Sequence, residues 1–258
     1  TACFSEPSRS EETMINPQWP KEIENGLIPT DNAMGIMTTE LSPAAEAFIS
    51  HAGRASRPVL EVGAAYGNAT LPALKTGATV IANDLSASQL AVLAASTPAD
   101  HSRHLVLAPA RFPDELKLSE GSLSGVLASQ VLHFLDGEEV ERSFQCVFRW
   151  LEPDGKFFVL VMTPSLSFYH DLRPAYTERA ARGLRWPGIF DPRIVAPPEW
   201  RDQLPSMVHL FEKDILARCA TEAGFEIETL EYFCFDNFPE KHRTDGQEYV
   251  TMTARKRP

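Results

Sequence analysis

The stretch Pro58–Leu74, which reads PVLEVGAAYGNATLPAL, contains the features that decide the fold. An apolar run ends at Glu61, small residues follow, and a helical pattern begins near Asn68. A strand, a glycine-containing turn and a helix in this order form the first unit of a parallel α/β sheet. Glycine lets a ligand approach the backbone closely, and the N–H groups that begin a helix suit a carboxylate. We therefore expect a ligand at this turn.

Strand and helix patterns continue to alternate on the C-terminal side of this turn, and one helix precedes it. Strands are expected at 57–62, 78–82, 104–108, 123–128, 156–162, 225–235 and 247–255, and helices at 41–51, 68–75, 86–95, 138–151 and 212–223. Unbroken apolar strands are typical of a parallel sheet that is covered on both faces. The pattern therefore predicts an α/β fold with a doubly wound, mostly parallel sheet.

Two segments fall outside this alternation. Residues 1–54 form an N-terminal extension whose helix we expect to help cover the active site, and residues 55–258 form the main domain. Residues 163–207 are far longer than the usual connection in such a fold, which is typical of a lid or a binding loop. Tyr169, His170 and Tyr176 in this insertion either pack within the lid or bind substrate.

Composition limits the choice of partner and compartment. The formal net charge is −11, whereas nucleic-acid binding needs a cationic face, and we expect the basic run Arg255–Arg257 to be a solvated tail. No apolar run is long enough to span a bilayer. The 4 cysteines are scattered without metal-ligand spacing, which predicts reduced thiols and no metal site. We expect a cytoplasmic monomer or homodimer with a small-molecule partner, and neither a nucleic-acid nor a membrane partner.

A second acidic residue, Asp84, ends the next predicted strand. Open α/β sheets bind ligands at this edge, where an acid can accept hydrogen bonds from both hydroxyls of a ribose. The alternative is that Asp84 caps the helix that begins near Ser86. A nicotinamide cofactor would require glycine at positions 65 and 68, which hold Ala65 and Asn68, so an oxidoreductase is disfavoured.

The spacing of Glu61, Gly63 and Gly67 resembles the first motif of the class I S-adenosylmethionine-dependent methyltransferases. Asp84 is similar to the ribose-binding acid of that family. The segments 110–113, 129–135, 151–156 and 223–226 resemble later motifs in the same order, so that the likeness covers about 55–163 and 210–255. It implies a seven-stranded sheet with an antiparallel last strand, S-adenosylmethionine as cofactor and S-adenosylhomocysteine as product.

The resemblance also implies a set of cofactor-binding residues, with Glu61 directed to the amino group of the methionine moiety. The set is Glu61, Gly63, Ala64, Ala65, Gly67, Asp84, Leu85, Ala110, Arg111, Phe112, Ser129 and Gln130. Two positions depart from the family pattern. Ala65 replaces its middle glycine, and Pro109-Ala110 stands where an acid often receives the adenine amino group.

The implied reaction is in-line displacement of the methyl group onto a bound acceptor. Alignment of two bound reactants can lower the barrier by about 7–11 kcal/mol, and a general base is needed only when the nucleophile holds its proton tightly. His133 is the first candidate for such a base and for substrate contact, and His170 is the second. The aromatic insertion favours a flat or apolar small-molecule acceptor. A non-catalytic cofactor-binding regulator or partner subunit, and a protein methyltransferase, stay open.

Overall fold

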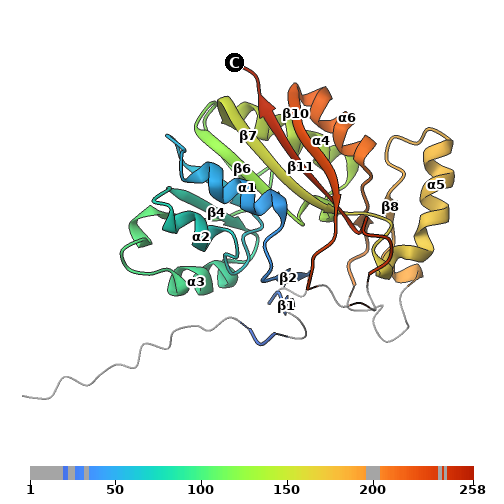
Figure 1. Ribbon diagram of the computed structural model, residues 1–258, viewed down its shortest axis with the longest axis horizontal. Helices are drawn as coiled ribbons and strands as arrows, with labels where there is room; N and C mark the ends of the chain where they lie inside the picture. The colour runs from blue at the N-terminus through green and yellow to red at the C-terminus, as the bar shows by residue number, and fades with distance from the viewer. Residues whose placement is uncertain (1–19, 23–26, 32–34, 196–203, 238–239, 241–242) are drawn as a thin grey trace, which may run out of the picture.

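The computed structural model describes residues 20–22, 27–31, 35–195, 204–237, 240 and 243–258 (Figure 1). Within these residues seven strands form one sheet in the order β10-β11-β7-β6-β3-β4-β5. Their bounds are β3 Val59–Val62, β4 Val80–Asp84, β5 Leu105–Pro109, β6 Leu123–Ser129, β7 Leu151–Met162, β10 Phe225–Phe233 and β11 Tyr249–Lys256. Only β11 runs against its neighbours β7 and β10, which confirms the expected fold class.

Helices cover both faces of this sheet, which therefore lies in the middle of three layers (Figure 1). The helices are α1 Pro43–Ala52, α2 Thr70–Lys75, α3 Ala87–Ser96, α4 Gly137–Trp150, α5 Arg173–Ala181 and α6 Lys213–Ala223. Helices α1 and α2 pack Phe48 and Leu74 against one face of the sheet, whereas α4 and α6 pack Phe144 and Leu216 against the other. Burial of each such side chain contributes about 1.5–3 kcal/mol.

Local sequence signals explain where three of the helices begin or end. The Ser42 side chain accepts a hydrogen bond from the Ala45 N–H at 3.2 Å, as expected of an N-cap before Pro43. Asp136 and Glu139 form a reciprocal capping box at the start of α4. Gly224 ends α6 in the left-handed conformation, with φ of 99°.

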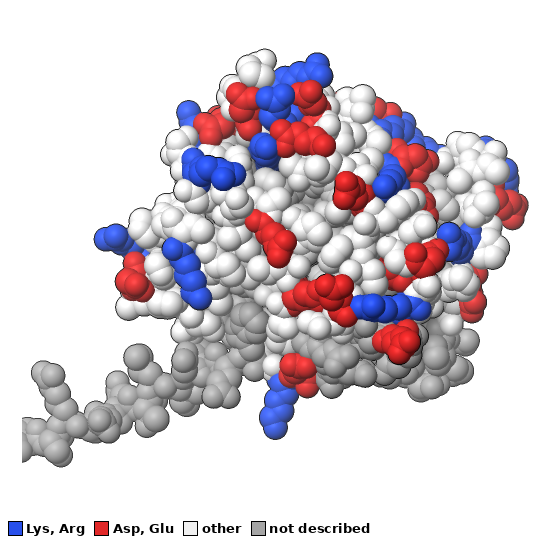
Figure 2. Space-filling view, viewed as in Figure 1, with Lys and Arg blue, Asp and Glu red and all other residues white. Residues whose placement is uncertain are grey.

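The basic residues near the C-terminus differ from the expected solvated tail. Arg255 and Lys256 belong to β11, where Arg255 is 2.9 Å from Asp154 and 2.7 Å from Glu226. Lys256 donates to the carbonyl of Leu151 at 2.8 Å. Figure 2 shows cationic and anionic side chains interspersed on the face in view. The register of β11 explains these contacts, because its pairing with β7 and β10 brings the basic residues beside polar groups of the neighbouring strands.

The insertion after β7 is largely folded. It contains a 3-10 helix at Ser167–Leu172, then α5, the short strand β8 (Ile189–Phe190) and a 3-10 helix at Pro192–Ile194. Strand β8 pairs with β9 (Val208–His209). Buried apolar residues join the insertion to the ends of β7 and β11, namely Leu160, Met162, Leu166, Leu172, Tyr176, Phe190, Val208, Leu210, Phe235 and Tyr249. Residues 196–203 of the expected insertion lie outside the described residues.

The N-terminal extension adds a small hairpin before α1. Strands β1 (Leu27–Pro29) and β2 (Ile36–Thr38) pair antiparallel, and Figure 1 places them below the sheet near its carboxyl edge. In the described part of the chain, no helix combines the length and apolar character needed to cross a membrane.

Candidate active site

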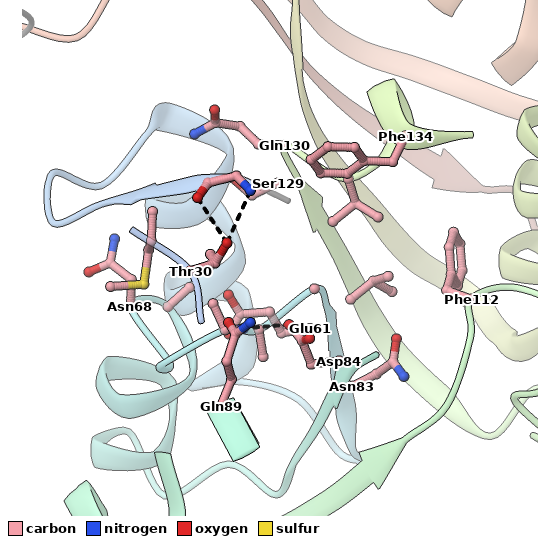
Figure 3. Close-up of a pocket in the computed structure, with 18 of the residues that line it drawn as sticks. Thr30, Glu61, Asn68, Asn83, Asp84, Gln89, Phe112, Ser129, Gln130 and Phe134 are labelled. Atoms are coloured by element: carbon pink, nitrogen blue, oxygen red, sulfur yellow. Dashed lines mark hydrogen bonds between the residues drawn. The ribbon is translucent and has the colours of Figure 1, made fainter. Parts of the chain in front are cut away.

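A cavity of about 270 Å³ opens at the carboxyl ends of β3, β4 and β6 (Figure 3). It lies where the strand order reverses between β3 and β6, which is the usual ligand site of an open α/β sheet. Of the predicted cofactor residues, those that line it are Glu61, Gly63, Ala64, Ala65, Asp84, Leu85, Ala110, Arg111, Phe112, Ser129 and Gln130. His133 also lines it, but Gly67 does not.

Glu61 stands at the floor of the cavity and is only 5% exposed. Its carboxylate accepts a hydrogen bond from the Thr70 hydroxyl at the start of α2. Burial raises the pKa of Glu61 to about 7, although the hydrogen bonds from Thr70 act in the opposite direction. A cationic ligand group beside this carboxyl would favour its ionised form. Glu61 is therefore suited to an ammonium group.

Neighbouring side chains leave little room for larger residues in the turn after β3. Gly63 has φ of 65°, and a Cβ atom there would lie 2.4 Å from Cγ2 of Val131. Gly67 has φ of 88°, and a Cβ atom there would lie 2.2 Å from Cδ1 of Leu93 in α3. Ala65 adopts φ of 46°, a left-handed conformation that costs a non-glycine residue about 1–2 kcal/mol. The structure thus explains Gly67 by packing against α3.

Asp84 holds this turn from the neighbouring strand. Its Oδ2 accepts from the N–H of Ala65 at 2.9 Å, and its Oδ1 accepts from the N–H of Ser86 at 2.8 Å. Burial raises the pKa of Asp84, and these two backbone donors oppose the rise. The N-cap of α3 is Ser86, whose side chain accepts from the N–H of Gln89 at 3.3 Å. Asp84 therefore faces the cavity with both oxygens oriented and one lone pair on each still available.

The side of the cavity beyond β4 is ordered by an asparagine that the sequence argument missed. Asn83 donates from Nδ2 to the carbonyls of Ala108 and Ala110, each at 2.8 Å, and so fixes the end of β5. Arg111 pairs with Glu139 at 2.5 Å. Leu85 is 59% exposed, which leaves an apolar surface at the cavity wall. A flat heterocycle would fit against this surface.

The N-terminal extension supplies another wall of the cavity, whose individual residues the sequence motifs did not identify. The added lining residues are Thr30, Gly35, Met37, Thr38, Glu40, Ser42 and Ala45. Asn68 donates from Nδ2 to the carbonyl of Thr38 at 2.8 Å, and the Ser86 hydroxyl donates to Asp31 at 3.0 Å. These bonds attach the hairpin to the turn and to α3. The sequence before residue 41 lacks helical or strand periodicity, so the lining role of its individual residues could not be predicted.

The far end of the cavity is formed by the 3-10 helix Leu132–Phe134 and by Phe235. Burial lowers the pKa of His133 to about 3, with a smaller effect from His209, and its ring centroid lies 4.0 Å from that of Phe134. His209 shares a 3.0 Å hydrogen bond between Nδ1 and the carbonyl of Leu135. His133 is consequently neutral at physiological pH.

Tyr169, His170 and Tyr176 lie apart from this lining. Tyr176 is buried between the insertion and the end of β7, and Tyr169 packs against the same cluster. None of the described residues between 163 and 207 lines the cavity. The described residues also contain no group of three or more His, Cys, Asp or Glu side chains that could hold a metal ion.

Comparison with known proteins agrees with this geometry. Residues 60–159 match the family model described as a methyltransferase domain. An S-adenosylmethionine-dependent methyltransferase from Mesorhizobium loti is 24% identical, with 83% of this chain and 96% of that one covered at a TM-score of 0.59. One from Methanosarcina mazei is 17% identical, with 84% and 99% covered at 0.62. No curated protein matches the sequence.

A third solved structure has a named acceptor. The 1,6-didemethyltoxoflavin-N1-methyltransferase of Burkholderia thailandensis, with 1,6-didemethyltoxoflavin and S-adenosylhomocysteine bound, is 21% identical. The alignment covers 84% of this chain and 77% of that one, at a TM-score of 0.56. The sheet order and these comparisons show that the chain has the fold of the S-adenosylmethionine-dependent methyltransferases, and residues 60–159 are similar to a methyltransferase domain.

Proposed function

We propose that this protein binds S-adenosylmethionine in the cavity and methylates a small, largely apolar acceptor. We infer the class of acceptor from the side chains that line the cavity on the side away from the turn after β3. Met37, Val131, Phe134, Leu135 and Phe235 line it with apolar surface. Such a wall favours a flat or apolar ligand, held in place by few polar contacts.

The residues around the turn fit the cofactor. Glu61 is suited to the ammonium group of the methionine moiety, and Asp84 to the hydroxyls of the ribose. Both are buried carboxylates that stand at neighbouring strand ends. Leu85 offers apolar surface to the adenine ring. Charge-assisted hydrogen bonds of this kind contribute about 1.5–3 kcal/mol each.

When bound, S-adenosylmethionine supplies an electrophilic methyl group, which bonds to the acceptor while the carbon–sulfur electron pair stays on sulfur. The task of the chain is to align the acceptor with that methyl group and to keep water out. Phe134 and Phe235 supply the apolar enclosure for this purpose.

The ionisable side chains that line the cavity support an uncharged acceptor. Apart from Glu61 and Asp84, those among the described residues are Glu40, His133 and Arg111, and Arg111 is paired with Glu139. Both carboxylate oxygens of Glu40 accept backbone N–H bonds, from Asp236 and Asn237, each at 2.9 Å. His133 is neutral, and its low pKa makes it a weak base. We infer that His133 orients the acceptor through a hydrogen bond instead of removing a proton.

The test is transfer of radiolabelled methyl groups into a cell extract separated by size. The full chain is incubated with labelled S-adenosylmethionine and either the fraction below about 1 kDa or the macromolecular fraction. We expect label in the small-molecule fraction, and at least tenfold slower labelling with Asp84→Ala at a subsaturating cofactor concentration, which controls for contaminating enzymes. Label in the macromolecular fraction would favour a protein methyltransferase. Absence of transfer to either fraction, with cofactor binding intact, would favour a non-catalytic subunit. Either result contradicts the proposal.

A further inference from the structure

One wall of the cavity contains a buried amide that the cofactor assignment above does not use. Gln89, in the first turn of α3, is 1% exposed and is one of the lining residues. Figure 3 shows its side chain reaching from α3 toward the turn and toward Asp84. Neither Nε2 nor Oε1 has a hydrogen-bond partner among the described residues.

A buried amide without hydrogen-bond partners destabilises the fold, whereas packing of α3 against the sheet requires only apolar side chains. Each buried donor or acceptor without a partner destabilises the fold by about 1–3 kcal/mol. A leucine or methionine would fill the same space, and α3 already packs Leu90 and Leu93 against the sheet. Buried polar side chains nearly always have partners, so an unpartnered amide beside a ligand cavity indicates a partner that arrives with the ligand.

The hydrogen bonds of Asp84 indicate which ligand group the Gln89 amide would bind. The two carboxylate oxygens of Asp84 are oriented by the N–H groups of Ala65 and Ser86, and a carboxylate can only accept hydrogen bonds. A vicinal diol can give both of its hydroxyl protons to this carboxylate. The hydroxyl oxygens then still lack a donor. The Nε2 of Gln89 can supply this donor, and its Oε1 can accept when a hydroxyl turns the other way.

We propose that Gln89 is a second ribose-binding residue and that Asp84 and Gln89 together select ligands with an intact 2′,3′-diol. This proposal rests on the proposed function, because it assumes that the cofactor occupies the cavity. The amide is neutral, so it can approach the carboxylate without the repulsion that a second acid would cause. A site that hydrogen-bonds a hydroxyl from both sides discriminates strongly against a ligand that lacks it.

Calorimetric titration of the full chain with two ligands tests this role. The ligands are S-adenosylhomocysteine and its 2′-deoxy analogue, and the proteins are the wild type, Gln89→Met and Gln145→Met. Gln145 is an exposed glutamine on α4 and serves as the matched control. We expect Gln89→Met to weaken S-adenosylhomocysteine binding at least tenfold, but to change binding of the deoxy analogue less than threefold. Gln145→Met should match the wild type with both ligands.

Two further measurements separate a binding role from a structural one. Because Gln89→Met removes a buried amide without partners, the ligand-free variant should melt at the same temperature as the wild type or higher. Gln89→Glu, which loses the donor, should also weaken S-adenosylhomocysteine binding at least tenfold. Unchanged affinity in Gln89→Met, or equal weakening with both ligands, would overturn the proposal for Gln89 alone. If the wild type failed to bind S-adenosylhomocysteine, the proposed function itself would fall.

Discussion

The carboxylate of Asp84 accepts a hydrogen bond from the backbone N–H of Ala65 at 2.9 Å, across the gap between β4 and the turn after β3. This bond joins the two acidic strand ends of the cavity into one unit. A second bond, from the N–H of Ser86, holds the other oxygen of the same carboxylate. The side chain that we assign to the ribose therefore also fixes the turn that we propose as the site of the methionine moiety.

Replacement of Asp84 with alanine should remove both effects. We expect affinity for S-adenosylhomocysteine to fall at least tenfold, which corresponds to about 1.4 kcal/mol, because the ribose loses its acceptor and the turn loses an anchor. Calorimetric titration measures this loss. Asp100→Ala is the matched control, since the Asp100 side chain is 77% exposed and outside the cavity lining. Unchanged affinity in Asp84→Ala would rule out the ribose assignment.

Gly67 should be required for packing and Gly77 only for its backbone conformation. Both have positive φ, of 88° and 90°, but a Cβ atom at Gly67 meets Leu93 whereas one at Gly77 meets nothing within 4 Å. Gly67→Ala should therefore lower the free energy of unfolding by at least about 1 kcal/mol more than Gly77→Ala does. Urea denaturation of the two variants measures the difference. Equal losses would mean that Leu93 moves away freely.

Glu61 should make the ligand-free protein less stable as the pH rises. Its pKa is about 7 in the fold and 4.5 as the ordinary value, so the native state retains a proton that the unfolded chain releases. This contribution to stability is complete below pH 4.5 and is lost as the pH rises through about 7. We expect the wild type to lose about 2–3 kcal/mol more than Glu61→Gln between pH 5 and pH 8. Parallel pH profiles in urea denaturation would contradict the raised pKa.

His133 should remain neutral well below physiological pH. Burial lowers its pKa to about 3, because the charged ring would lose its solvation. NMR spectroscopy of the ligand-free protein, with the ring signals assigned by comparison with His133→Gln, should show constant chemical shifts from pH 8 to pH 5. A titration near pH 6.5 would instead restore His133 as a candidate general base.

Glu40 should hold the N-terminal segment to the loop after β10. Its two oxygens accept from the N–H groups of Asp236 and Asn237, which follow the lining residue Phe235. Glu40→Ala should speed hydrogen exchange at these two amides at least tenfold, as seen by NMR or mass spectrometry. Glu40→Gln keeps one acceptor and should give an intermediate rate. If Glu40→Ala exchanged at the wild-type rate, these bonds would not limit the opening of the wall.

The sheet and the glycine-containing turn after β3 could be predicted because their signals are local. The sequence marks two strand ends. The apolar run before Glu61 is followed by the glycine at position 63, and the next apolar run ends at the acid at position 84. Parallel strands bring such ends to one edge of the sheet. Eleven of the predicted cofactor residues consequently lie together, whereas Gly67 belongs to the packing of α3.

The wall formed by Thr30, Gly35, Met37, Thr38 and Glu40 depends on long-range contacts, which no periodic pattern reveals. Asn68 and Thr38 meet only after the chain has folded, and the carboxylate of Glu40 finds its partners on a loop near the C-terminus. Gln89 looks like an ordinary helical residue in the sequence, since its burial becomes visible only when α3 is placed against the turn. Helical periodicity reports which face is buried but not which buried atom lacks a partner.

Calorimetric titration of the wild-type protein with S-adenosylmethionine, S-adenosylhomocysteine, NAD and NADP shows which cofactor the cavity binds. We predict one binding site for each of the first two ligands and no measurable binding of the two dinucleotides. Tight binding of NAD or NADP without binding of S-adenosylmethionine would contradict the assignment of the cavity.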